Sequence, residues 1–438
     1  MKKKNWTILL LSLMLMSVMA LTACGGNNNA STSGNKEENG AAANGEKDKD
    51  QKPVKLTVGI WESTADINFW TEKLKAYTAE RSHVTVELEK IPDNGGQYLK
   101  VRLAAHDLPD MFFLKPAHFQ TYKEKLLPLD GLKAVENNKY PTVVDGKVLG
   151  LPLVSFSEYI YYHPSIFEEL GLEVPTTLPE FEDVMAKIKE DGKYIPLSLG
   201  AKDAWTFYPF SEFGPHVLSG DEDYLANLAK TEEPFGEGST FQRIAGLLKE
   251  MKDNKYAGPD ALGISFEQSK QQFESNKAAM IAVGQWYYPS YMEVIGNDDD
   301  LGVFPMPFRA TESDPLYSMT MADMNIGINS DSKQQEEAKL LLEWMLSQDV
   351  YTDYINTLQQ VSTMNDVTTD LPFFNKWNEL HPFETFIYNG TDEGFSKVKA
   401  AAQFDHSVSA QEVFAGKAIE KIAEELNGRW AKAVKSNQ

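Results

Sequence analysis

Apolar and polar residues alternate just after residue 53, and the period of the pattern then changes to that of a helix. The alternation over 54–61 predicts a strand that ends at Trp61. From about Ile67 to Arg81 apolar residues recur every three or four positions, which predicts a helix. The next predicted elements are a strand at 84–88, a helix at 98–105 and a strand at 111–114. This order is typical of a parallel α/β sheet.

The rest of the chain continues to mix the two periods. Thr177 with Glu180 three residues later forms a capping box, which predicts the start of a helix that Gly192 ends. Further strands are expected at 146–154, 159–162, 195–199, 278–283, 301–304 and 325–328. Further helices are expected at 240–254, 266–275 and 334–346, and the last third is predicted to be mostly helical up to Trp430.

The N-terminus carries an export signal. Three lysines precede an apolar run of about fourteen residues that ends in Leu21-Thr-Ala, and residues 1–23 therefore read as a signal peptide. A helix that spans a membrane needs roughly twenty apolar residues, so an uncleaved anchor is the weaker alternative. The lone Cys24 after Leu-Thr-Ala resembles the lipobox of bacterial lipoproteins. That resemblance implies a lipid on Cys24 and a position on the outer side of the cell membrane.

Composition narrows the range of partners. Residues 24–53 contain no aromatic residue and little that could form a core, so we expect a disordered tether behind the lipidated cysteine. The chain has 42 Lys and Arg against 64 Asp and Glu, a formal net charge of −22. An acidic chain of this kind is not expected to bind nucleic acid. Since Cys24 is the only cysteine, the folded part offers no thiol for a disulfide, a metal or catalysis.

Signatures of catalysis are missing from the sequence. The seven histidines show no His-x-His or His-Glu-x-x-His spacing, so a zinc site is unsupported. Residues 263–267 lack the last glycine of a nucleophile elbow, and no dinucleotide-binding fingerprint occurs. We therefore expect no metal and no cofactor. A large exported α/β chain without these signatures points to a binding protein.

Tryptophans and carboxylates recur near the ends of the predicted strands. Ligands of open α/β sheets bind outside the carboxyl ends of the strands. Indole rings can cover the apolar face of a sugar, and carboxylates accept hydrogen bonds from its hydroxyl groups. The candidate ligand-binding residues are Trp61, Glu62, Asp110, Asp203, Trp205, Trp286 and Asp323.

Each of these residues also has an ordinary structural interpretation. A tryptophan of an α/β protein often packs in the core, and an aspartate in a loop often caps a turn. Four other tryptophans lie on helical faces and are assigned to the core: Trp70, Trp344, Trp377 and Trp430. Only the coincidence of both residue types at several strand ends favours a site.

Short stretches resemble, in order, the extracellular solute-binding proteins of family 1, the maltose-binding-protein-like receptors of carbohydrate ABC importers. The stretches are 103–110, 149–152, 161–172, 175–181, 278–286, 304–307 and 332–346. The resemblance covers nearly all of the chain from Val54 onward. It implies an α/β, two-lobed periplasmic-binding-protein-like fold of type II, with a ligand cleft between the lobes and three hinge crossings.

The resemblance also implies domain boundaries and a function. It puts the N-lobe at 54–156 and 321–358, and the C-lobe at 157–320 and 359–438. It implies a monomeric, non-enzymatic lipoprotein that binds a sugar or oligosaccharide by hinge closure and delivers it to an ABC permease. It supports the candidate residues, points to the Asp110–Lys115 region as a whole, and adds Phe156 and His406. An exported glycoside hydrolase and a receptor for a non-sugar solute remain alternatives.

Overall fold

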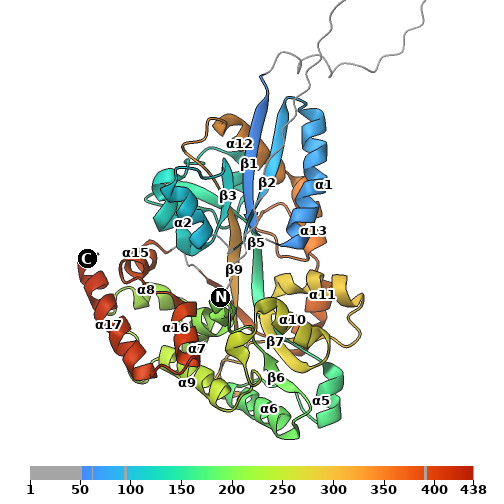
Figure 1. Ribbon diagram of the computed structural model, residues 1–438, viewed down its shortest axis with the longest axis vertical. Coiled ribbons are helices and arrows are strands. Elements are labelled where there is room, and N and C mark those ends of the chain that lie inside the picture. The colour runs from blue at the N-terminus through green and yellow to red at the C-terminus, as the bar shows by residue number, and fades with distance from the viewer. Residues whose placement is uncertain (1–51, 62, 93–95, 389–391, 438) are drawn as a thin grey trace, which may run out of the picture. The chain divides into compact units, whose positions relative to one another are not determined.

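The structure, a computed structural model, describes residues 52–61, 63–92, 96–388 and 392–437 (Figure 1). The predicted signal peptide, the lipidation site Cys24, almost all of the predicted tether and the candidate residue Glu62 lie outside the described residues. Contacts between residues unite the described residues into one compact unit. The predicted division into two lobes therefore stays a prediction.

The first three strands are parallel, as the sequence predicts. Strand β1 (Val54–Trp61) lies between β2 (Val84–Ile91) and β3 (Met111–Leu114) and pairs in parallel with both. Helix α1 (Thr64–Glu80) connects β1 to β2, and α2 (Gln97–Ala104) lies between β2 and β3 in the chain. The predicted strand–helix–strand–helix–strand order is confirmed.

Two long strands join this part to the rest of the sheet. The hydrogen-bonded order is β2-β1-β3-β9-β5-β7-β6, and β9 (Tyr317–Ile328) runs antiparallel to both β3 and β5 (Lys147–Tyr162). Two sequence predictions were wrong here. The strands expected at 146–154 and 159–162 are one strand, and the strand expected at 325–328 begins eight residues earlier, at Tyr317. Ser155 and Ser157 interrupt the apolar run of β5, yet both pair with β9, so backbone hydrogen bonds continue the strand.

Strand β5 changes partners in its last third. Its residues from Leu151 to Ser157 pair with β9, whereas Glu158 to Tyr162 pair with β7 (Ala278–Gly284). On its other edge this end of β5 pairs with β8 (Gly302–Pro305), and β6 (Ile195–Ser198) is parallel to β7. The two short strands β4 (Thr142–Val144) and β10 (Glu384–Tyr388) pair with β5 and β9.

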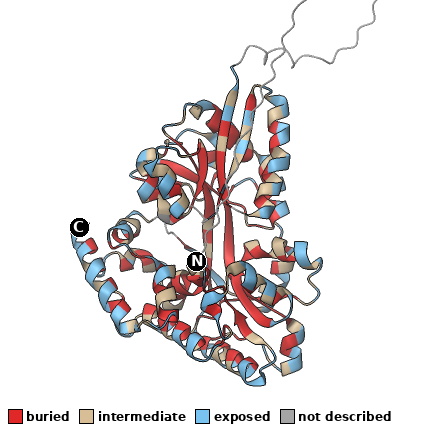
Figure 2. Cartoon of the chain, viewed as in Figure 1, coloured by how far each residue is buried: buried red, intermediate tan, exposed pale blue. Residues whose placement is uncertain are grey.

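Helices cover the sheet, and the central strands are its most buried part (Figure 2). Helix α6 (Leu178–Asp191) begins with the predicted capping box of Thr177 and Glu180 and is followed by Gly192 in a left-handed conformation. The longer of the other helices are α9 (Thr240–Asp253), α10 (Phe266–Glu274), α11 (Tyr288–Ile295), α12 (Gln335–Met345), α13 (Gln348–Leu358), α14 (Pro372–Leu380), α15 (Glu393–Ala401), α16 (His406–Phe414) and α17 (Ile419–Ser436). The shorter ones are α3 (Phe119–Tyr122), α4 (Lys133–Asn137), α5 (Pro164–Leu170), α7 (Gly214–Ser219) and α8 (Tyr224–Leu228). Within the described residues, no helix combines the length and the apolar character that a membrane span requires.

Candidate functional site

An ion pair lies at the carboxyl ends of β1 and β3. The Lys115 ammonium donates a hydrogen bond of 2.7 Å to Oδ2 of Asp323 on β9, and it lies 4.5 Å from the ring centre of Trp61. Asp323 is only 2% exposed, and its Oδ1 has no hydrogen-bond partner among the described residues. Burial raises the pKa of the Asp323 carboxyl, and the charge of Lys115 opposes that shift. The pair therefore leaves one buried oxygen able to accept a hydrogen bond.

A second buried carboxyl belongs to Glu158, where β5 changes partners. Glu158 is 1% exposed, and its Oε1 accepts a hydrogen bond of 2.5 Å from the Tyr208 hydroxyl. Its Oε2 has no partner among the described residues. Burial raises the pKa of Glu158 to about 8, although the Tyr208 hydrogen bond and the charge of Lys115 act in the opposite direction.

Aromatic rings stand beside Glu158. Trp286 lies in the 3₁₀ helix η6 (Gln285–Tyr287) directly after β7, and its indole N–H donates a hydrogen bond of 3.2 Å to the Tyr208 hydroxyl. The Trp205 ring centre is 6.1 Å from that of Trp286 and 4.6 Å from that of Phe266. Trp205 and Trp286 are both partly exposed. We call Trp205, Tyr208, Phe266 and Trp286 the aromatic cluster.

Gly284 leaves the space in which this arrangement forms. A Cβ atom added at this position would lie 2.3 Å from Nε1 of Trp286 and 2.8 Å from Oε1 of Glu158. Both distances are below van der Waals contact. The backbone φ of Gly284 is an ordinary −70°, so the glycine is needed for space and not for its conformation.

A further buried polar group lies nearby, around Glu212 in the π-helix η4 (Pro209–Phe213). Its carboxylate accepts a hydrogen bond from the Tyr388 hydroxyl and lies 3.5 Å from the Lys399 ammonium. Burial alone would raise the pKa of Glu212, but the charge of Lys399, the nearby His406 and the Tyr388 hydrogen bond lower it to about 2. The charge of Lys115 also contributes to the lowered pKa of Glu212.

His406 belongs to the same group. It is 8% exposed at the start of α16, and its ring centre is 4.3 Å from that of Phe404. Burial, together with the charge of Lys399, lowers the pKa of His406 to about 4. The imidazole is therefore neutral at physiological pH.

The structure brings together four of the predicted site residues. Trp61 and Asp323 meet at Lys115, while Trp205 and Trp286 meet in the aromatic cluster beside Glu158. Asp203 lies close to them, where its Oδ2 accepts a 2.7 Å hydrogen bond from the backbone N–H of Phe266 and so fixes the loop before Trp205. Phe156 is 3% exposed within β5, opposite Met321 of β9, and His406 lies in the Glu212 group.

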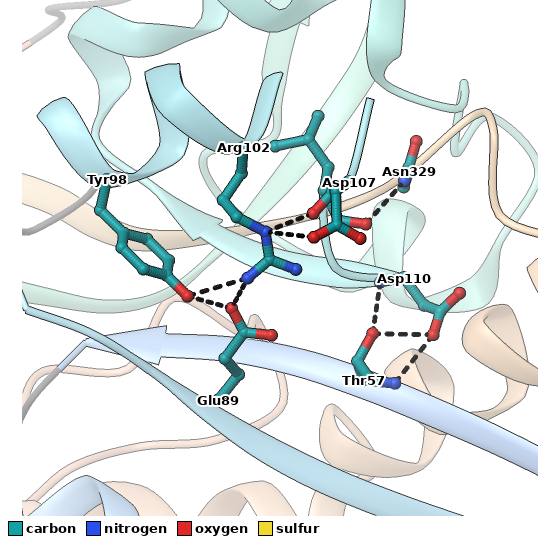
Figure 3. A network of polar contacts seen from close by, with 8 residues as sticks. Thr57, Glu89, Tyr98, Arg102, Asp107, Asp110 and Asn329 are labelled. Carbon is teal, nitrogen blue, oxygen red and sulfur yellow. Dashed lines mark hydrogen bonds and ion pairs between the residues drawn. The ribbon is translucent and has the colours of Figure 1, made fainter. Parts of the chain in front are cut away.

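Asp110 lies beside Thr57 of β1, as Figure 3 shows. It precedes β3, whereas Lys115 follows the same strand. Its carboxylate accepts hydrogen bonds from the backbone N–H and the hydroxyl of Thr57, at 2.8 and 2.9 Å, and from the Ser332 hydroxyl at 2.6 Å. These contacts join β1 to the start of β3, so we leave Asp110 out of the proposed site.

Sequence reasoning missed Glu158, Tyr208 and Glu212. For Glu158 a signal exists, because it is a charged residue within the apolar run 147–162 of a buried strand. Tyr208 and Glu212 lie in an irregular segment of short helical turns, where no periodicity marks the inward-facing side. Among the described residues, no group of three His, Cys, Asp or Glu side chains could hold a metal ion.

The chain belongs to the family of bacterial extracellular solute-binding proteins, whose pattern it matches over residues 61–352. It is 26% identical over 326 residues to the multiple sugar-binding protein of Streptococcus mutans, which covers 70% of this chain and 74% of that one. It is 24% identical over 278 residues to the melibiose/raffinose/stachyose-binding protein MelE of Bacillus subtilis, with 62% and 65% covered. The predicted family is confirmed.

Solved structures share the fold. The binding protein of an ABC transporter from Bifidobacterium animalis subsp. lactis, in complex with mannobiose, superimposes with a TM-score of 0.75 at 20% identity and covers 90% of this chain and 97% of that one. A sugar transporter protein from Bacillus licheniformis, in complex with stachyose, gives a TM-score of 0.69 at 19% identity, with 87% and 100% covered. The predicted periplasmic-binding-protein-like fold is confirmed.

Proposed function

We propose that this protein is a cell-surface receptor that binds a neutral sugar or oligosaccharide and delivers it to the permease of an ABC importer. The observation that carries the proposal is the aromatic cluster beside the buried carboxyls of Glu158 and Asp323. Partly exposed indole rings offer flat apolar faces, and the two carboxyls each keep one oxygen that no described residue hydrogen-bonds. That combination suits a ligand with apolar C–H faces and many hydroxyl groups.

The relatives named above support a sugar as the ligand. The names of the two sequence relatives specify sugars, and the two solved structures hold mannobiose and stachyose. In our proposal Trp286 and Trp205 stack on sugar rings, while Asp323 accepts from a hydroxyl group through Oδ1. Lys115 keeps Asp323 ionised and oriented. Trp61, on the other side of Lys115, encloses the ammonium group.

Binding is proposed to close a hinge at the predicted crossings 156/157, 320/321 and 358/359. These segments are neighbours. Ser155 of β5 pairs with Ala322 of β9 and forms an isolated bridge with Val361 on its other side. Strand β5 changes partners between Ser157 and Glu158, so a small rotation of the backbone there would move Glu158 relative to Asp323.

A thermal-shift and calorimetry screen tests the proposal. The probes are melibiose, raffinose, stachyose, mannobiose and mannotriose, each with the intact mature protein. A sugar at 100 times its dissociation constant should stabilise the fold by about 2.7 kcal/mol. If none of these sugars raises the melting temperature or gives a binding isotherm, sugar binding by this protein is contradicted. Bound sugar should be recovered intact after long incubation, whereas cleaved products would favour the hydrolase alternative.

Attachment through Cys24 is the other part of the proposal, and it rests on the sequence alone. Cys24→Ser should move the protein from the membrane fraction to the medium, because the lipid is the only proposed anchor. The wild-type protein, washed with carbonate in parallel, is the control. A Cys24→Ser protein that stays in the washed membranes would mean that the N-terminal apolar run is a helical anchor.

A further inference from the structure

We propose that Glu158 binds the sugar as a protonated carboxyl, donating its Oε2 hydrogen to a ligand oxygen, so that binding takes up one proton. The inference rests on the proposed function and adds the chemical role of one residue. Its starting point is geometry. Glu158 is 1% exposed, and its two oxygens differ, since Oε1 accepts from Tyr208 and Oε2 has no partner among the described residues.

A chain of hydrogen bonds fixes which oxygen carries the proton. The indole N–H of Trp286 can only donate, so the Tyr208 oxygen accepts from it. The single hydroxyl hydrogen of Tyr208 is then directed at Oε1 of Glu158. Oε1 therefore acts as an acceptor, and a proton on Glu158 must reside on Oε2. A protonated Glu158 thus has its hydrogen-bond donor on Oε2, the carboxyl oxygen that has no partner in the described part of the chain.

Burial favours the neutral carboxyl, while the charge of Lys115 favours the ionised form and that of Asp323 opposes it. The groups that act on Glu158 are Tyr208 from the segment before η4, Lys115 from the end of β3 and Asp323 from β9, and Tyr161 lies on its own strand. The Lys115 ammonium donates its hydrogen bond to Asp323, so the buried carboxyls of Asp323 and Glu158 share the charge of one cation. Among the described residues, no cation forms an ion pair with Glu158. Burial without a paired cation raises its pKa to about 8.

The direction of the pH effect follows from this shift. In an open form with Glu158 in water, the carboxyl has its ordinary pKa of 4.5, and in the buried form its pKa is about 8. Between these values closure takes up a proton, because the buried form binds more protons than the open one. Affinity for a neutral sugar should therefore fall as pH rises, by up to about tenfold per pH unit, and should level off above about pH 8.

Calorimetry of the tightest-binding probe among raffinose, stachyose and mannotriose tests the inference. Titrations near pH 7 in phosphate and in Tris, which differ in ionisation enthalpy, count the protons exchanged. The wild type should take up close to one proton, and its affinity should fall about tenfold or more from about pH 6 to about pH 8. Glu158→Gln has an amide N–H that donates at every pH. It should take up no proton and bind more tightly than the wild type at about pH 8.

Two further variants separate this role from a structural one. Glu158→Ala, which has no donor, should bind the same sugar at least about tenfold more weakly than Glu158→Gln does, and its affinity should not change with pH. Glu169→Gln changes an exposed glutamate that pairs with Lys193, and it should keep the wild-type affinity, pH profile and proton count. A wild-type affinity that is flat with pH, together with weaker binding by Glu158→Gln, would mean that Glu158 acts as a carboxylate. That result overturns the inference and leaves the proposed sugar receptor intact.

Infrared spectroscopy tests the protonation of Glu158 in the sugar-bound form. The difference spectrum between the sugar-saturated and the sugar-free wild type near pH 6.5 should contain a carboxylic-acid C=O band, and the same difference spectrum of Glu158→Gln should lack it. A wild-type difference spectrum with only carboxylate bands contradicts the inference and leaves the sugar receptor intact. If the wild type binds none of the sugars, it is the proposed function that fails.

Discussion

The Lys115 ammonium donates a 2.7 Å hydrogen bond to Asp323 while lying 4.5 Å from the ring centre of Trp61. The three residues come from the ends of β1 and β3 and from β9, which is about two hundred positions further along the chain. The ion pair is largely withdrawn from water, since the Asp323 side chain is 3% exposed and that of Lys115 is 31% exposed. A buried carboxylate with a single cation depends strongly on that cation.

Lys115→Met should therefore destabilise the protein. Removing one partner of a fully buried pair typically costs about 3–5 kcal/mol, and the partial exposure of Lys115 puts our expectation at about 2–3 kcal/mol. Urea denaturation at neutral pH measures the loss. The double variant Lys115→Met/Asp323→Asn should recover part of it, because the charge left unpaired is gone.

The matched control is the exposed pair of Lys187 and Asp183, whose side chains are each 58% exposed. Lys187→Met should change the free energy of unfolding by no more than about 0.5 kcal/mol. If Lys115→Met and Lys187→Met lose equal free energies of unfolding, burial does not strengthen the contribution of the Lys115–Asp323 pair to stability, and the prediction is wrong.

Trp286→Ala should weaken sugar binding more than it weakens the fold. Trp286 is partly exposed in the aromatic cluster, and losing a stacking face of this size should reduce affinity by about 5- to 150-fold. The control is Trp430→Ala, at a position that is 0% exposed in α17, where about 3–5 kcal/mol of stability should be lost. A Trp286→Ala protein that melts far below the wild type but binds sugar normally would place this indole in the core.

Gly284→Ala should disturb the site through size alone. The new methyl group would overlap Nε1 of Trp286, so the indole must move, at a cost of about 1–3 kcal/mol and with weaker sugar binding. Gly246 in α9 is the control, because a Cβ there would meet nothing within 4 Å. Gly246→Ala should raise stability by about 0.5–1 kcal/mol. Thermal unfolding of both variants tells whether the effect of Gly284→Ala comes from the overlap with Trp286 or from replacing a glycine as such.

Thr177→Ala should remove the capping box of α6. The Thr177 hydroxyl accepts from the backbone N–H of Glu180, and losing such a cap costs about 1 kcal/mol. Ser347→Ala is the comparison, since Ser347 precedes α13 without a side-chain capping bond and should cost less. Chemical denaturation of the two variants checks the difference. Equal losses would mean that the hydroxyl of Thr177 does not act as a cap.

Glu212 should stabilise the protein at neutral pH and lose this effect in acid. Its folded-state pKa of about 2 lies below the ordinary value of 4.5, so its contribution is complete above about pH 4.5 and declines as pH falls towards 2. Glu212→Gln should melt below the wild type near pH 6, and the gap should narrow by about pH 3. The exposed Glu379→Gln should match the wild type throughout. A gap that does not change with pH contradicts the ionic role of Glu212.

The sequence predicted the elements well wherever their signals are local. The strand over 54–61, the helix that follows it and the capping box at Thr177 are all found, because period and caps depend on neighbouring residues. Of the tryptophans assigned to the core, Trp70 and Trp430 are 1% and 0% exposed. Trp344 and Trp377 are only half-buried. The helical pattern indicates which side of a helix faces the core, but not how deeply a side chain on that side is buried.

The candidate site was predictable only in part. Trp61, Trp286 and Asp323 were found because they lie at the ends of strands or within them. Glu158 was missed because the polar residues within 155–158 predict a break between two strands. Asp110 was predicted as a ligand-binding residue because it adjoins a strand in the sequence. It lies at the opposite end of β3 from Lys115, where Thr57 and Ser332 donate hydrogen bonds to its carboxylate.

By itself the sequence determined the acidic charge, most local elements and the family, and it predicts an export signal and a lipobox. These properties depend on residue types and on spacings within short stretches, which the chain carries before it folds. Only the tertiary structure decided that β5 is continuous and that Lys115 lies beside Asp323. It also decided that Glu158 is buried with one oxygen that bonds to none of the described residues, because burial and long-range hydrogen bonds form only when distant segments pack together.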